Sequence, residues 1–170
     1  IWKVVPAVEA TTAEGLETAL TTRGKIVALG QDLEYASSIS PASNTSLVMK
    51  NGAVFKSTND DSNNINTLLS ISATGVKISG NGTLEAAPNE PPISFIEVRN
   101  GGSVDISGNL TFDAKGGSQA NNAIKIIKGT ANIHSGYFHT VGGATKESTS
   151  ECIYLASDWS ASSKANLNIY

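Results

Sequence analysis

The sequence predicts an all-β protein: a right-handed, single-stranded parallel β-helix of about six coils with a short N-terminal capping helix. Three observations predict it: a repeated segment, short alternating runs between Gly and Asn corners, and one amphipathic segment near the start. The repeat is clearest where VKISGN at 76–81 returns as VDISGN at 104–109, so that Ile78 and Ile106 lie 28 residues apart. A period of this length, built from short strands, is typical of a stacked solenoid.

The first predicted element is a helix over residues 12–20. Apolar residues recur at Ala13, Leu16, Ala19 and Leu20, and a threonine is available as the N-cap. The first coil of a β-helix exposes an open core and an unpaired strand edge, and a helix placed before it would cover both. We therefore divide the chain into residues 1–23, an N-terminal segment with the capping helix, and residues 24–170, the β-helix.

Weaker copies extend the repeat in both directions. Met49 lies 29 residues before Ile78, Ile133 lies 27 after Ile106, and residues 24–29 supply one earlier turn. Ile169 follows Ile133 by 36 residues, which predicts an insertion within residues 142–150. The residues expected to stack as inward ladders are Val76, Ile78, Val104, Ile106 and Ile133.

Each repeat holds two short strands around a Gly/Asn corner, and a third strand is expected just ahead, at 67–72, 94–99, 123–128 and 152–156. Three strands per period suit a coil with three faces. At 95–99 and 123–128, apolar residues alternate with charges, as in strands with one buried and one solvated face. The alternative fold is a β-sandwich or jelly roll.

Composition and charge narrow the classes of partner. The net charge is −3, and the 12 Lys and Arg residues are scattered, so nucleic acid is not an expected partner. No apolar run is long enough to span a membrane. The single cysteine, Cys152, is expected to be a small buried hydrophobe.

Because the chain stops within the strand-like run at Ile169 and Tyr170, we expect the β-helix to be truncated there, with further coils or another chain at that end.

The repeated V-x-I-S-G-N unit, the capping helix and the three-strand period together resemble the pectin-lyase-like right-handed parallel β-helix superfamily, including uncharacterised surface proteins of gut bacteria. The resemblance covers roughly residues 11–170 and concerns the scaffold. It implies an extracellular or bacterial cell-surface protein whose partner is a polysaccharide or glycan. Lyases, glycoside hydrolases, tailspikes and adhesins share this scaffold, so fold analogy does not choose among them.

Few residues of this sequence match the catalytic signatures of that superfamily. A lyase-like site needs acids to hold calcium and an Arg or Lys to abstract a proton, and the candidates are Arg99, Glu97 and Asp105. Their simpler interpretation is a solvated strand face. A hydrolase-like site needs paired acids, yet the pair at 60–61 reads as part of an insertion loop. His134 and His139 read as surface histidines, and no metal site is predicted; calcium would enter only with a lyase-like site.

Aromatic side chains offer another route to carbohydrate, because sugar faces stack on exposed rings. The candidates for glycan binding are Trp159, Asp158, Tyr137 and Tyr154, which cluster late in the chain. Phe138 is expected to be a core residue.

Taken together, the sequence favours a non-catalytic β-helix module, adhesin-like or carbohydrate-binding, and predicts no cofactor. A polysaccharide lyase or glycoside hydrolase with an incomplete site is the alternative.

Overall fold

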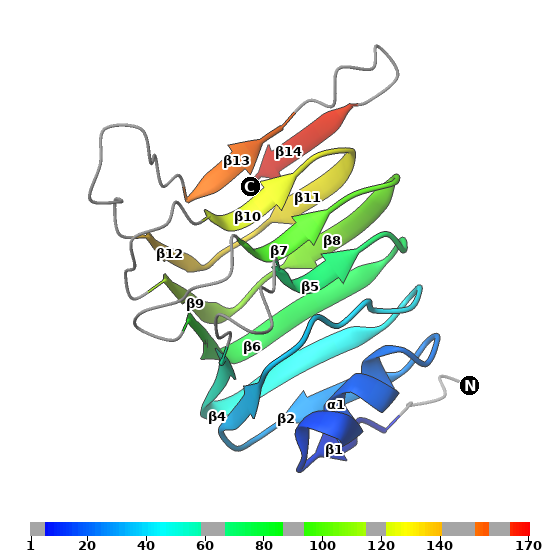
Figure 1. Ribbon diagram of the computed structural model, residues 1–170, viewed down its shortest axis with the longest axis vertical. Coiled ribbons are helices and arrows are strands. Elements are labelled where there is room, and N and C mark those ends of the chain that lie inside the picture. The colour runs from blue at the N-terminus through cyan, green and yellow to red at the C-terminus, as the bar shows by residue number, and fades with distance from the viewer. Residues whose placement is uncertain (1–5, 59–66, 87–93, 115–121, 141–151, 157–163) are drawn as a thin grey trace.

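The computed structural model describes residues 6–58, 67–86, 94–114, 122–140, 152–156 and 164–170 (Figure 1). These residues form one helix, α1 (Ala13–Leu20), and a series of short strands. The strands are β1 (Val8–Ala10), β2 (Ile26–Leu29), β3 (Leu33–Tyr35), β4 (Ser46–Ser57), β5 (Thr67–Ile71), β6 (Val76–Ala86), β7 (Ser94–Val98), β8 (Gly102–Ile106), β9 (Asn109–Ala114), β10 (Asn122–Ile126), β11 (Gly129–Ile133), β12 (Tyr137–Thr140), β13 (Ile153–Leu155) and β14 (Ala165–Ile169).

All strand pairs among the described residues are parallel, and non-consecutive strands pair with one another. The larger sheet follows the order β1-β2-β4-β6-β8-β11-β14, with β3, β9 and β12 pairing off this path. The smaller sheet has the order β13-β10-β7-β5. Successive repeats thus stack one above another, as Figure 1 shows. The prediction of an all-β chain with parallel strands and one helix is confirmed.

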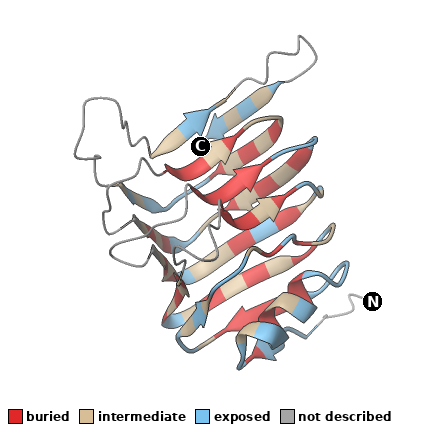
Figure 2. Cartoon of the chain, viewed as in Figure 1, coloured by how far each residue is buried: buried red, intermediate tan, exposed pale blue. Residues whose placement is uncertain are grey.

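One ladder of apolar residues runs along the larger sheet in register. Its members on neighbouring strands are Val27, Leu47, Ile78, Ile106, Ile133 and Ile169. All five residues predicted to point inward in the repeats are buried. Figure 2 shows buried and less buried residues alternating along these strands, as a sheet with one face in the core requires.

The predicted alignment of Met49 with Ile78 is wrong, because Leu47 pairs with Ile78 and Met49 pairs with Gly80. A slip of two residues leaves every side chain on the same face, so apolar alternation does not distinguish these registers. The extra residues are absorbed at an irregularity between Met49 and Ala53, where Asn51 and Gly52 both have positive φ.

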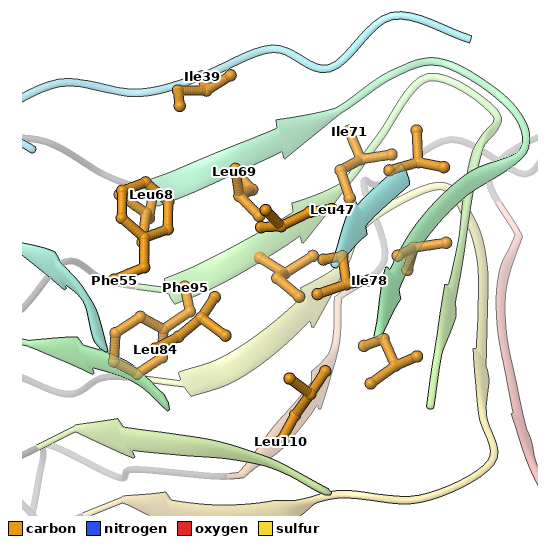
Figure 3. Packing of buried hydrophobic residues seen from close by; sticks show 14 of the residues in the cluster. Ile39, Leu47, Phe55, Leu68, Leu69, Ile71, Ile78, Leu84, Phe95 and Leu110 are labelled. Atoms are coloured by element: carbon orange, nitrogen blue, oxygen red, sulfur yellow. The ribbon is translucent and has the colours of Figure 1, made fainter. Parts of the chain in front are cut away.

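A second ladder contains most of the aromatic core. Phe55, Leu84, Phe112 and Phe138 pair in register through β4, β6, β9 and β12. The rings of Phe112 and Phe138 stack with centroids 4.8 Å apart, which confirms Phe138 as a residue packed on the core. Figure 3 shows Phe55, Leu84 and Phe95 close to the leucines and isoleucines of the other strands, so both sheets contribute to one core.

Helix α1 begins at the predicted place and packs against β1, β2 and β3 at one end of the stack (Figure 1). The backbone N–H of Gly15 donates to Thr12 Oγ1 at 3.0 Å, so Thr12 is the N-cap. Leu16 and Leu20 are fully buried. Burial and a hydrogen bond to Glu17 raise the pKa of Tyr35 to about 12, and this contact links the helix to β3.

Candidate functional site

Glu97 and Arg99, two of the three catalytic candidates, lie together on the smaller sheet. Arg99 Nε donates to Glu97 Oε1 at 2.9 Å, and Lys125 Nζ lies 3.6 Å from Glu97 Oε2. Glu97 is only 6% exposed, so the predicted alternation of a buried and a solvated face is wrong for β7, which is buried along its whole length. The carboxylate is held between two cations, an arrangement suited to an ion-paired structural cluster.

The third candidate, Asp105, belongs to the other sheet. Asn132 Nδ2 donates to Asp105 Oδ1 at 2.6 Å, and Asn168 Nδ2 donates to Asn132 Oδ1 at 2.8 Å. The corner between Arg99 and β8, where Asn100 and Gly101 both have positive φ, carries the chain from one sheet to the other. The structure therefore joins Glu97 to Arg99 and gives Asp105 different partners.

The Glu97 cluster leads to a stability prediction. Glu97→Ala is expected to lower the free energy of unfolding by about 1–3 kcal/mol, because the partly buried Lys125 ammonium loses its partner. Urea denaturation followed by circular dichroism measures the loss. Glu34→Ala is the matched control: Glu34 also pairs with a lysine, Lys56, but its side chain is 64% exposed, so about 0.5 kcal/mol or less is expected. Equal small losses would contradict the cluster.

The two aromatic candidates that the structure describes, Tyr137 and Tyr154, lie on different sheets. Tyr137, in β12, is 63% exposed and lines a shallow groove of about 290 Å³. The other residues of this groove are Gly108, Asn109, Leu110, Thr111, Ser135 and Gly136. Tyr154, in β13 of the smaller sheet, is 41% exposed and pairs in register with Lys125. Asp158 and Trp159 lie outside the described residues.

The two histidines have separate partners. His134 stacks on Tyr170 with ring centroids 4.5 Å apart, whereas His139 Nδ1 lies 3.0 Å from Asp113 Oδ1 on the neighbouring strand. Cys152 is half-buried and its thiol donates to the carbonyl oxygen of Phe138 at 3.4 Å. Within the described ranges, no three His, Cys, Asp or Glu side chains gather as metal ligands would.

The outer face of the larger sheet carries a groove that the sequence analysis did not single out. It has a volume of about 340 Å³ and is formed by residues of β2, β4, β6 and β8, together with one residue just after β8 and one just after β11. Its lining residues are Ile26, Ser46, Val48, Lys77, Ser79, Asp105, Ser107 and His134. The repeat could have indicated an outward-facing surface here, because the residues before and after each inward isoleucine point outward.

The groove residues form two rows across the strands. Ile26, Ser46, Lys77 and Asp105 are in register on four successive strands, and Asn132 and Asn168 continue this row. Val48 and Ser79 begin the second row. Ser107 and His134 follow the next two ladder isoleucines in that row, with Tyr170 stacked on His134. The groove thus presents serine hydroxyls, an imidazole and two opposite charges on strands about 4.8 Å apart.

Comparison of this chain with protein-family models, with curated proteins and with solved structures finds no match in any of the three. The single helix of the described residues is too short to cross a membrane.

Proposed function

We propose that this chain is a non-catalytic, adhesin-like module, at the cell surface or outside the cell, that binds a glycan. We further propose that its three strands per repeat form the faces of a right-handed parallel β-helix of about six coils. The cellular location follows from the resemblance to the pectin-lyase-like superfamily and is proposed on that ground.

The fold proposal is supported by the register of the strands. Residues of successive repeats pair in parallel on each of three stacks, and α1 packs at one end. Coils that wind in one direction produce this pattern, since a parallel neighbour is reached only after a full circuit of the chain. A sandwich built from hairpins would pair its strands antiparallel instead.

The observation that carries the binding proposal is the groove on the outer face of the larger sheet. A ligand lying along it would pass Ile26 and Val48 at one end and then meet polar side chains from successive repeats, Ser46, Lys77, Ser79, Asp105, Ser107 and His134. Glycans present hydroxyl groups that both donate and accept hydrogen bonds, and serine hydroxyls do the same. An extended glycan running across the strands is therefore the ligand that fits this surface best.

The alternative is a polysaccharide lyase or glycoside hydrolase. Its candidate base, Arg99, donates to Glu97, and Glu97 is buried between Arg99 and Lys125. Groups engaged with one another in this way are poorly placed to exchange protons with a substrate. We therefore favour binding over catalysis.

Affinity electrophoresis in gels that contain neutral or uronate-rich polysaccharides tests the proposal. Retardation by at least one polysaccharide is expected, without new chain ends in the presence or absence of calcium. Ser79→Tyr places a large side chain in the middle of the groove and should weaken retention about tenfold or more, equivalent to about 1.4 kcal/mol.

Thr83→Tyr is the matched control, because Thr83 lies on the same strand, β6, but outside the groove. Retention of the Thr83→Tyr variant should equal that of the unmodified chain. Equal retention of both tyrosine variants would place the glycan elsewhere, for example beside Tyr137. New chain ends would instead favour the enzyme.

A further inference from the structure

We infer that the groove on the larger sheet selects a neutral, hydroxyl-rich glycan and discriminates against polyuronates and sulfated glycans. This inference rests on the proposed function and specifies the chemical class of the ligand.

The groove is lined by one lysine and one aspartate, whose charges are opposite. Lys77 and Asp105 occupy register-matched positions on β6 and β8, and both line the groove. An anionic sugar that approaches the Lys77 ammonium therefore also approaches the Asp105 carboxylate. The attraction and the repulsion largely cancel, and the net charge of −3 on the whole chain adds a weak repulsion.

Asp105 is held in place by a chain of side-chain hydrogen bonds. Its Oδ1 accepts from Asn132, and Asn132 in turn accepts from Asn168. Swinging the carboxylate away from an incoming anion would break the first of these bonds. The Asp105 carboxylate therefore stays in the groove and repels an anionic ligand.

The same two groups suit neutral sugars. Lys77 is exposed, and its side-chain ammonium has no hydrogen-bond or ion-pair partner among the residues that the structure describes. Its ammonium can donate to one sugar hydroxyl while Asp105 accepts from the adjacent hydroxyl of the same ring. Ser46, Ser79 and Ser107 flank this pair and supply further donors and acceptors.

The two ends of the groove carry apolar and aromatic side chains that also suit a neutral sugar. Ile26 and Val48 give it an apolar side at one end, and the His134 ring, stacked on Tyr170, closes the other. Sugar rings carry C–H faces that pack on apolar and aromatic surfaces without any charge. The combination of C–H contacts and a balanced donor–acceptor pair is a recognition surface for an uncharged polymer.

Affinity electrophoresis with galactomannan and mixed-linkage β-glucan as neutral probes, and polygalacturonate as the charged probe, tests the inference. The unmodified chain should be retarded by a neutral probe, with less than about a twofold change between ~50 and ~500 mM NaCl, since screening affects charged ligands most. Polygalacturonate should retard it at least about tenfold less.

Asp105→Asn gives the sharper result. It removes the negative charge and keeps the size, so Lys77 is left as an unbalanced cation. This variant should gain retention by polygalacturonate that disappears at high salt, while retention by the neutral probe falls severalfold. Lys77→Gln combined with Asp105→Asn should lose the gained retention. Far-UV circular dichroism and melting temperature identify any variant that fails to fold.

The outcomes separate the two proposals. If the unmodified chain binds polygalacturonate more tightly than the neutral probes, and salt abolishes that binding, the inference about neutral glycans is wrong while glycan binding stands. Failure of Asp105→Asn, as a folded protein, to gain polygalacturonate binding also overturns the inference. Failure of the unmodified chain to bind any polysaccharide overturns both proposals.

Discussion

Replacing Phe112 by alanine is expected to lower the free energy of unfolding by about 3–5 kcal/mol, the range typical of a deleted core aromatic ring. Phe112 is fully buried, stacks on Phe138 and lies 6.4 Å from the ring of Phe95. It also pairs in register with Leu84, so its loss opens a cavity between consecutive repeats and across two sheets. Urea denaturation monitored by circular dichroism measures the effect.

Tyr137→Ala is the control for Phe112→Ala. Tyr137 lies in β12, beside Phe138, but is 63% exposed, and its removal should change stability by about 0.5 kcal/mol or less. If the two alanine variants unfold at the same urea concentration, the aromatic ladder does not form the core described here.

Gly108→Ala is expected to destabilise the protein by about 2–5 kcal/mol. Gly108 has φ of +89°, which costs an L-residue about 1–2 kcal/mol. An added Cβ would also meet the backbone of Gly80 on the neighbouring repeat, 2.8 Å from its nitrogen and closer still to its oxygen. Backbone atoms cannot rotate away as side chains do, so the strands must separate at a further cost of about 1–3 kcal/mol.

The matched control for this change is Gly101→Ala. Gly101 has nearly the same φ, +84°, but nothing lies within 4 Å of its added Cβ. Only the conformational cost, about 1–2 kcal/mol, should remain. The difference between the two variants in the same urea titration therefore isolates the close approach of neighbouring corners. Equal losses would contradict the stacking of Gly108 over Gly80.

Local pattern was enough to predict most elements of this fold. Helix α1 starts at Thr12, one of the two threonines, Thr11 and Thr12, that were available as its N-cap. The strands expected at 67–72, 94–99, 123–128 and 152–156 form within two residues of those limits. The inward positions of Ile78, Ile106 and Ile133 were predicted correctly. Each of these features depends on neighbours a few residues away, through capping, alternation and turn residues, and such information is present in any short window of sequence.

Partners across repeats were harder to predict. The burial of Glu97 depends on Lys125, which lies on a different strand, and alternation within β7 alone indicated a solvated carboxylate. The groove was missed for the same reason. Alternation within each repeat indicates that Lys77 and Asp105 point outward, but it does not indicate that they lie beside His134 and Ser46.

The sequence by itself determined that the chain is built from parallel-stacking β repeats, which end of the stack α1 covers, and which side chains of the V-x-I repeats point inward. Only the tertiary structure decided that Leu47, and not Met49, continues the isoleucine ladder. It also placed Asp105 on the larger sheet, away from Glu97 and Arg99, and brought two rows of outward side chains together in one groove. The physical reason is that alternation has a period of two residues and is unchanged by a two-residue slip. Register between repeats is set instead by corner geometry and by contacts between residues 20 to 36 positions apart along the isoleucine ladder, which are made only when the whole stack assembles.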